Sequence, residues 1–170
     1  MQLREKDLSG RELFLLAEKT KRLCAKYGAA LFINDRIDVA LAVDAVGVQL
    51  TSSSIPVDAA RELLGEKKFI GVSTHSLREA QSAARAGADF ILFGPVYFTP
   101  SKAAYGAPQG LELLREIAQN VSCAVYAIGG INARNLGAVK ETGVHGVALI
   151  SAVLSAGDPR QGAEELTRLL

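Results

Sequence analysis

Residues 124–132 read Ala-Val-Tyr-Ala-Ile-Gly-Gly-Ile-Asn. The first five residues are apolar or aromatic and include the β-branched Val125 and Ile128, which is typical of a buried strand. The strand stops at Gly129 and Gly130, and Asn132 is a residue type that caps a following helix. Two glycines let a backbone approach a ligand closely, and a helix start presents unpaired N–H groups. The stretch therefore predicts a strand–turn–helix unit with a candidate phosphate seat at its turn, although an ordinary tight turn would have the same residues.

Strand and helix patterns alternate along the whole chain. Capping boxes at Ser9–Glu12 and Ser76–Glu79 and the Asp158–Pro159 pair mark helix starts. Continuous apolar strands between amphipathic helices predict a parallel sheet covered by helices. The expected strands are 2–3, 29–33, 47–50, 69–72, 90–93, 125–128 and 146–150.

These strands number seven, whereas a closed (β/α) barrel has eight. Either the sheet is open or a barrel lacks its first unit. The chain of 170 residues has no linker or low-complexity segment, so we expect one domain over residues 1–170.

Composition excludes several kinds of partner. The formal net charge is +1 and hydrophobic residues make up 49% of the chain, so nucleic acid and anionic membranes are not expected partners. No apolar run reaches the roughly 18 residues of a membrane span, and the start resembles no signal peptide. Cys24 and Cys123 lack metal-site spacing and are expected to be inert thiols. The sequence therefore predicts a cytoplasmic protein.

Polar residues follow nearly every expected strand, where parallel βα proteins carry their sites. Each has a structural alternative: the charges at residues 4–7 as a solvated cluster, Asp35 as a helix cap, and His75 as a structural histidine. A long loop over residues 94–110 is more often functional than not. The candidates are Gln2, Arg4, Lys6, Asn34, Asp35, Gln49, His75, Thr99, Ser101, Lys102, Gly129, Gly130 and Ser151.

Several motifs in order resemble the thiamin phosphate synthase/TenI superfamily over nearly the whole chain. They are Gln2-Leu-Arg-Glu-Lys6, Asn34-Asp-Arg36, Gly47-Val-Gln-Leu50, Gly71-Val-Ser-Thr-His75, Gly94-Pro-Val-Tyr-Phe-Thr99 and Ile128-Gly-Gly-Ile131. The resemblance implies a (β/α)8 TIM-barrel fold, here lacking the first β-α unit and so N-terminally incomplete.

The superfamily contains thiamin phosphate synthases, which join hydroxymethylpyrimidine diphosphate to a thiazole phosphate and expel pyrophosphate with Mg²⁺. In that branch, by resemblance, the diphosphate is held at Gln2, Arg4, Lys6, Asn34 and Lys102. The metal is held at Asp35 and at a second aspartate, which is Ser54 in this chain. The thiazole phosphate lies on Gly129, Gly130 and Ser151.

The other branch contains TenI-type thiazole tautomerases, which aromatise a carboxythiazole phosphate and need no cofactor. Ser54, in place of the second aspartate, and Gln49, in place of the usual histidine, favour this branch. His75 would move the proton, while Gln49 and the loop from Thr99 through Ser101 to Lys102 would shape the site. We therefore expect a tautomerase.

A Mg²⁺-dependent synthase is the alternative, and a non-catalytic thiamin-phosphate-binding barrel is a third reading. In the tautomerase reading the partner is a small phosphorylated thiazole, and a homo-oligomer is left open.

Overall fold

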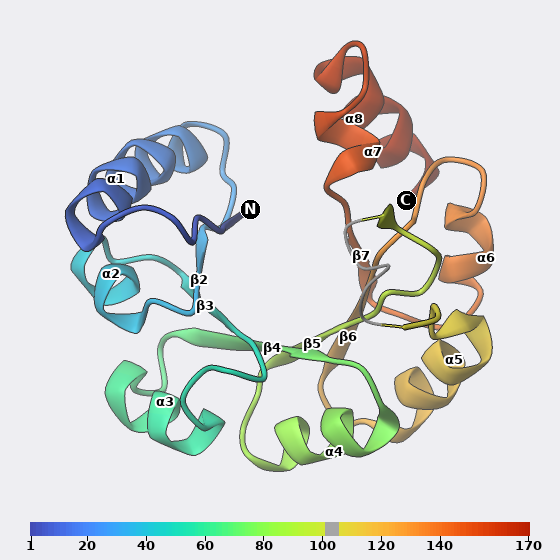
Figure 1. The fold of residues 1–170 in the computed structure, drawn as a ribbon, viewed down its shortest axis with the longest axis horizontal. Helices are drawn as coiled ribbons and strands as arrows, with labels where there is room; N and C mark the ends of the chain where they lie inside the picture. The colour runs from blue at the N-terminus through green and yellow to red at the C-terminus, as the bar shows by residue number, and fades with distance from the viewer. Residues whose placement is uncertain (101–105) are drawn as a thin grey trace. The chain divides into compact units, whose positions relative to one another are not determined.

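A computed structural model describes residues 1–100 and 106–170. Seven strands form one sheet in the order β1-β2-β3-β4-β5-β6-β7, and helices follow the strands along the chain (Figure 1). The strands are β1 (Gln2–Leu3), β2 (Phe32–Asn34), β3 (Gly47–Leu50), β4 (Phe69–Thr74), β5 (Phe90–Phe93), β6 (Ala124–Ile128) and β7 (Gly146–Ala148). The helices are α1 (Gly10–Lys26), α2 (Ile37–Ala42), α3 (Val57–Leu64), α4 (Leu77–Arg85), α5 (Gly110–Asn120), α6 (Leu136–Lys140), α7 (Ser151–Leu154) and α8 (Pro159–Leu169).

The chain divides into two compact units, the first made of residues 1–73 and 85–89. Its strands pair in parallel, with Ile33 opposite Val48 and Val48 opposite Ile70. All three are fully buried and pack with side chains of α1, α2 and α3 in one core. Because side chains alternate between the faces of a strand, the next residues along β2 and β3, Asn34 and Gln49, lie on the opposite face.

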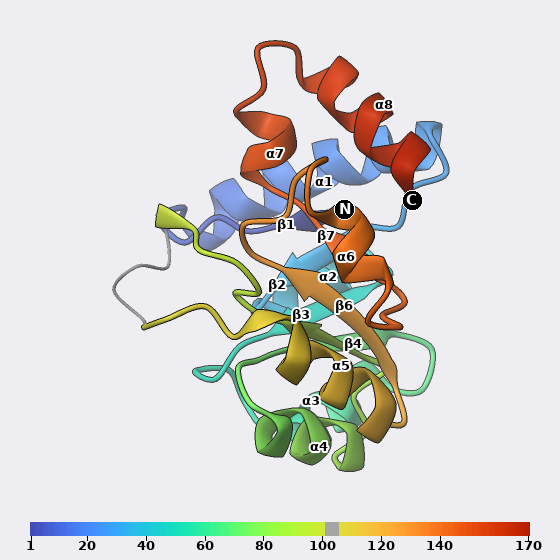
Figure 2. The same ribbon diagram turned by 90° about the vertical axis from the view of Figure 1, so that its right-hand side faces the viewer.

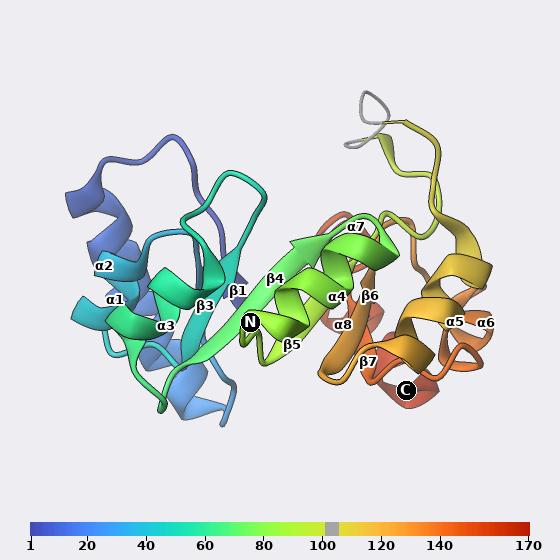
Figure 3. The same ribbon diagram turned by 90° about the horizontal axis from the view of Figure 1, so that it is seen from below.

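The second unit comprises residues 74–84 and 90–170. Ile91 of β5 lies opposite Val125 of β6, and these buried residues share a core with Leu114 and Ile117 of α5. Helix α5 lies along β6 (Figure 3), and α7 and α8 lie against each other (Figure 2). The opposite face of these strands carries Phe90 and Tyr126, whose rings meet edge to face with centroids 5.7 Å apart.

The local signals for helix starts are confirmed in two cases. Ser9 and Glu12 form the full capping box at α1. Asp158 accepts hydrogen bonds from the backbone N–H groups of Arg160 and Gln161 at the start of α8.

Several expected element boundaries are wrong: the strand expected over 29–33 spans Phe32–Asn34, and the one expected over 69–72 extends to Thr74. The helix expected from Asn132 begins at Leu136, because the Asn132 carboxamide oxygen accepts the N–H of Arg134 (2.9 Å) and closes a turn. The strand expected to reach Ile150 ends at Ala148, and the short helix α7 follows from Ser151.

The predicted class, α/β with a parallel sheet of seven strands, is confirmed within the described residues. A single domain over residues 1–170 stays a prediction. None of the helices in the described ranges is long and apolar enough to cross a membrane.

Candidate functional site

The first unit brings together the amide side chains that the sequence selected. Gln2 donates from Nε2 to Oδ1 of Asn34 (3.0 Å), which links the start of β1 to the end of β2. Gln49 donates from Nε2 to the hydroxyl of Ser73 (3.1 Å), which links β3 to β4. Asn34 and Gln49 are buried and lie side by side in the parallel register. A row of polar groups therefore runs across the four neighbouring strands β1, β2, β3 and β4.

Ser73, one of the polar residues that follow the expected strand 69–72, belongs to this row. It lies two residues before His75, in the motif Gly71-Val-Ser-Thr-His75. Its neighbour Thr74 is buried and its hydroxyl lacks a hydrogen-bond partner among the described residues. Strand alternation explains the placement of Ser73: Gly71 lies opposite Gln49 in the register, and Ser73, two residues on, shares its face.

Asp35 does not cap α2. It has φ of 66°, and its backbone N–H donates to the carbonyl of Gln49 (2.9 Å). The N-cap of α2 is Arg36, without a side-chain cap. A left-handed conformation costs a non-glycine residue of order 1–3 kcal/mol and persists where the surroundings impose it, often at functional sites. The Asp35 carboxylate is exposed and makes no hydrogen bond to a described residue.

Arg36, next to Asp35, is already engaged. Its Nε and Nη2 donate to the two carboxylate oxygens of Asp38 at 2.8 and 2.5 Å. These hydrogen bonds hold the pKa of Asp38 below its usual value and raise the pKa of Arg36. The cations at this end without an ion pair to a described residue include Arg4 and Lys6, both exposed.

The serine-rich loop after β3 closes on itself. The Ser54 hydroxyl accepts the N–H of Thr51 (2.7 Å) and lies 3.2 Å from the Thr51 hydroxyl. Ser53 also lies within hydrogen-bonding distance of the Thr51 hydroxyl (3.1 Å). This turn offers hydroxyls and no carboxylate.

The donor set can be compared with what Mg²⁺ requires. Within residues 1–100 and 106–170, no group of three or more His, Cys, Asp or Glu side chains is arranged to hold a metal. Mg²⁺ sites commonly use one or two protein carboxylates together with substrate phosphates and water. Asp35 alone fits such a site when diphosphate oxygens complete it.

The second unit contains the glycine turn after β6. Gly129 and Gly130 have φ of 100° and 65°. A Cβ on Gly129 would lie 2.6 Å from Pro95 Cα, and one on Gly130 would lie 2.5 Å from the Phe98 carbonyl oxygen. Close packing by residues 94–98 therefore explains why both residues are glycine.

The same turn also leaves hydrogen-bond donors free. In the described part of the chain, no partner is found for the N–H groups of Gly130 and Ile131. The Gly130 carbonyl, in contrast, accepts from the side chains of Asn132 (3.3 Å) and Asn135 (3.0 Å). The turn is thus held from its carbonyl side while its N–H groups stay available for an anion.

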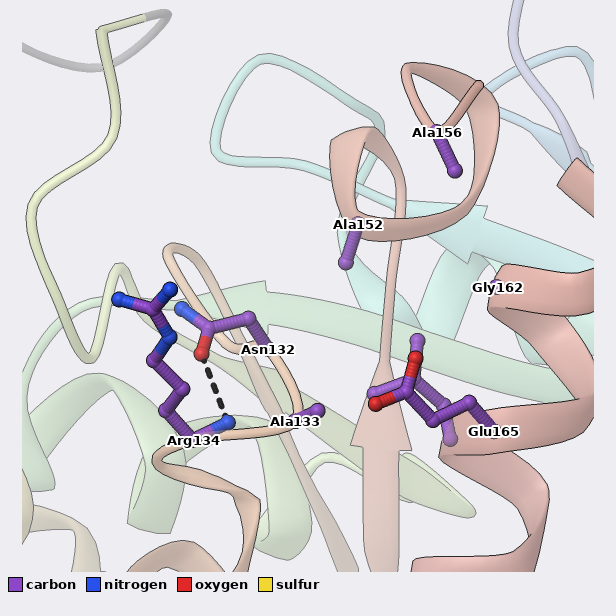
Figure 4. Close-up of a pocket in the computed structure, with 8 residues that line it drawn as sticks. Asn132, Ala133, Arg134, Ala152, Ala156, Gly162 and Glu165 are labelled. Carbon is purple, nitrogen blue, oxygen red and sulfur yellow. Dashed lines mark hydrogen bonds between the residues drawn. The ribbon is translucent and has the colours of Figure 1, made fainter. Parts of the chain in front are cut away.

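Ser151 starts α7 and is exposed. Ile128 lies opposite Ala148 in the register, so the turns that follow β6 and β7 leave neighbouring strand ends. Beside them a pocket of about 330 Å³ lies between residues 132–134 and helices α7 and α8 (Figure 4). Glu165 and Leu166 line its α8 side, and Arg134, which the sequence did not select, lines the other.

The remaining candidates are placed as follows. His75 is exposed, and its Nδ1 forms a hydrogen bond with the Gly94 carbonyl oxygen. Thr99 is half-buried. Ser101 and Lys102 lie outside the described residues.

Residues 1–153 match the family described as "Thiamine monophosphate synthase". The chain belongs to this family. A "Putative thiamine-phosphate synthase" of Geobacter sulfurreducens is 49% identical over 170 residues, which is 100% of this chain and 80% of the relative. A "Thiamine-phosphate synthase" of Desulfitobacterium hafniense is 46% identical over 99% of this chain and 82% of its own length.

Solved structures agree with the family assignment. "Thiamine phosphate pyrophosphorylase from Pyrococcus furiosus" superposes with a TM-score of 0.91 at 43% identity, over 99% of this chain and 80% of that one. A 3-hexulose-6-phosphate synthase with a TM-score of 0.77 is only 19% identical and shows the fold alone. The expected TIM-barrel type, with one unit fewer than the complete fold in the described residues, is confirmed.

The expectation of a TenI-type tautomerase is wrong. Family members that are 42–49% identical over nearly the full chain are named as synthases. The serine at position 54 does not exclude a synthase, because one carboxylate plus substrate phosphates is an ordinary set of ligands for Mg²⁺. The synthase alternative has the better support.

Proposed function

We propose that this member of the thiamine monophosphate synthase family is a Mg²⁺-dependent thiamin phosphate synthase. Its substrates would be hydroxymethylpyrimidine diphosphate and a thiazole phosphate. The thiazole nitrogen forms a bond to the pyrimidine methylene carbon, the carbon–oxygen bond to the diphosphate breaks, and pyrophosphate leaves with the electron pair. The products are thiamin phosphate and pyrophosphate.

The observation that carries this proposal is the Asp35 carboxylate at the end of β2. It is exposed, is held in an uncommon backbone conformation by Gln49, and makes no hydrogen bond to a described residue. The neighbouring cation Arg36 is paired with Asp38 and does not neutralise it by contact. A carboxylate kept available in this way suits a metal ligand.

The diphosphate is assigned to the first unit. Arg4 and Lys6 supply two positive charges free of ion pairs with described residues, and the linked amides of Gln2 and Asn34 supply polar contacts. Mg²⁺ bound at Asp35 would stabilise the charge that develops on the leaving diphosphate. Lys102 and Ser101 would add to this set, and Gln49 would position Asp35 through its own backbone carbonyl.

The thiazole phosphate is assigned to the second unit. The unpaired N–H groups beside Gly129 and Gly130 and the exposed Ser151 are donors without a competing partner in the described residues. Backbone N–H groups bind phosphate oxygens without bulky side chains. Thr99 directly follows residues 94–98, which pack against the glycine turn, and would border the bound phosphate.

The test is to incubate the purified protein with both substrates and Mg²⁺ and to measure thiamin phosphate and pyrophosphate in equal amounts. We expect product that disappears when Mg²⁺ is chelated. Asp35→Asn should lower turnover at least about 100-fold, since transition-state charge stabilisation of this kind is worth several kcal/mol. Glu62→Gln, which removes an exposed carboxylate from α3 in the same unit, is the control. Substrate binding without any product would overturn the proposal in favour of a non-catalytic binder.

A further inference from the structure

His75 has a contact that the proposed reaction does not use. Its ring Nδ1 forms a hydrogen bond with the carbonyl oxygen of Gly94, and its backbone N–H donates to the Glu79 carboxylate (2.8 Å). Both contacts lie inside the second unit. A carbonyl oxygen only accepts, so Nδ1 carries the proton in this bond, whichever state Nε2 adopts.

We propose that His75 is a positioning residue that fixes the phosphate-binding turn through the Gly94 carbonyl. The path runs from His75 to Gly94, along residues 94–98, and from there to the turn at residues 129–131. The kinetic part of this inference rests on the proposed function, because it takes that turn as the seat of the thiazole phosphate.

The first step of the path is the placement of Gly94. Besides the bond to His75, the Gly94 N–H donates to the Thr74 carbonyl (3.4 Å). A Cβ on Gly94 would lie 2.1 Å from the Ile128 carbonyl oxygen, so this residue lies directly against the end of β6. Any shift of Gly94 would therefore displace the backbone at Ile128, where the glycine turn begins.

The second step is the contact between the two segments. The Val96 N–H donates to the Ile128 carbonyl (2.9 Å), and the Tyr97 N–H donates to the Gly129 carbonyl (3.0 Å). Pro95 and Phe98 lie so close to Gly129 and Gly130 that neither glycine could carry a side chain. The N–H groups that would bind phosphate are thus oriented by residues 94–98, which His75 holds at their start.

Two amide substitutions separate positioning from proton transfer. Asparagine places an amide N–H near the position of Nδ1, whereas the longer glutamine places one near Nε2. We expect His75→Asn to preserve the bond to Gly94 and His75→Gln and His75→Ala to lose it. Arg78→Ala, an exposed change in the first turn of α4, which follows His75 along the chain, is the matched control.

The experiment combines hydrogen exchange with kinetics. In His75→Gln and His75→Ala, the amides of Val96 and Tyr97 should exchange faster and the KM for thiazole phosphate should rise about tenfold, the size of one lost hydrogen bond. The value of kcat should change less than about twofold. His75→Asn and Arg78→Ala should match the unsubstituted protein in exchange, in KM and in the pH profile of KM.

The possible results distinguish failure of the positioning role from failure of the proposed function. Unchanged exchange at Val96 and Tyr97 in His75→Ala overturns the proposal, as does a large loss of kcat in both His75→Ala and His75→Asn, which would indicate that the imidazole takes part in the chemistry. If the unsubstituted protein makes no thiamin phosphate, the proposed function fails. The exchange pattern of the variants still decides the positioning role in that case.

Discussion

Gln49 Nε2 donates to the Ser73 hydroxyl across neighbouring strands at 3.1 Å, while the Gln49 backbone carbonyl accepts the N–H of Asp35. One residue therefore connects the end of β4 with the backbone of Asp35, whose carboxylate we assign to the metal. Gln49 is 2% exposed, so its amide has no water to replace a lost partner.

Replacement of Gln49 tests this connection. Gln49→Ala leaves a space and an unpaired Ser73 hydroxyl, and should lower the free energy of unfolding by about 1–3 kcal/mol. Asp35 keeps its backbone bond, so kcat should fall less than in Asp35→Asn. Chemical denaturation and steady-state kinetics measure the two effects, and Gln81→Ala, on the half-buried face of α4, serves as control. A kcat as low as that of Asp35→Asn would contradict this division of roles.

The glycine turn gives a second prediction. Gly130→Ala must adopt φ of 65° with a Cβ 2.5 Å from the Phe98 carbonyl oxygen. A left-handed alanine costs about 1–2 kcal/mol before the clash is counted, so stability and affinity for thiazole phosphate should both fall. Gly137→Ala, inside α6 with nothing within 4 Å, should instead be neutral or stabilise by up to about 1 kcal/mol. Thermal unfolding and phosphate titration compare the pair; equal effects would refute the packing argument.

The serine-rich loop after β3 gives a third prediction. Ser54→Asp adds a second carboxylate at the position where, by resemblance, synthases carry one, and an aspartate can still accept the Thr51 N–H. We expect the Mg²⁺ concentration for half-maximal activity to fall about tenfold or more, because charged oxygens dominate binding of hard cations. Binding of Mn²⁺ without substrate, followed by electron paramagnetic resonance, should strengthen in parallel. Ser53→Asp controls for added charge, and an equal gain in both variants would indicate a nonspecific effect.

An ion pair on the first unit gives a fourth. Asp89 Oδ2 accepts Arg61 Nη2 (2.6 Å) and the Ile70 N–H (2.7 Å), and so fixes the start of β4. Asp89→Asn removes the charge from both bonds and should lower the free energy of unfolding by about 1.5–3 kcal/mol. Glu62→Gln, an exposed change on α3, should have little effect. Kinetics at low temperature should be unchanged in both, and a loss of kcat would show that the pair does more than stabilise.

The pH dependence of stability in acid gives a fifth prediction. Hydrogen bonds from Lys68 and Lys21 lower the pKa of Asp44 from 3.8 to about 2. Because the folded value lies below the unfolded one, the carboxylate stabilises the protein above about pH 4 and loses that contribution as the pH falls towards 2. The melting temperature of Asp44→Asn should therefore lie below that of the unsubstituted protein at neutral pH and converge with it in this window. A difference that persists at pH 2, or one shared by Glu66→Gln, would contradict this reasoning.

Much of the fold could be predicted from local pattern. The β-branched run before Gly129 and the capping box at Ser9 depend on neighbours in sequence, and both predictions are confirmed. The start of α6 was placed too early because Asn132 and Asn135 fold the turn back onto Gly130. The hydrophobic periodicity of the sequence gives no information about such a side-chain contact with the backbone.

The site was harder to predict, because its decisive contacts join distant residues. The sequence predicts Gln2, Asn34 and Gln49 as site residues. It does not predict that the Gln49 side chain donates to Ser73 or that the Gln49 carbonyl accepts the N–H of Asp35. His75 was interpreted from its position after a strand, while its Nδ1 contact with Gly94 spans 19 residues. The tautomerase prediction is wrong for a related reason. It rests on the missing second carboxylate, whereas phosphate oxygens of a substrate can also serve as ligands for Mg²⁺.

The packing of residues 94–98 onto the glycine turn links two segments that lie about 30 positions apart in the chain. A residue larger than glycine at position 129 or 130 would displace Pro95 or Phe98. A shift of Pro95 or Phe98 towards the turn would likewise displace the two glycines. Loop exchange between relatives should therefore succeed when both segments are transplanted together and fail when either moves alone. If the proposed thiazole phosphate site is redesigned for a different phosphorylated heterocycle, the two segments should be exchanged together as one unit.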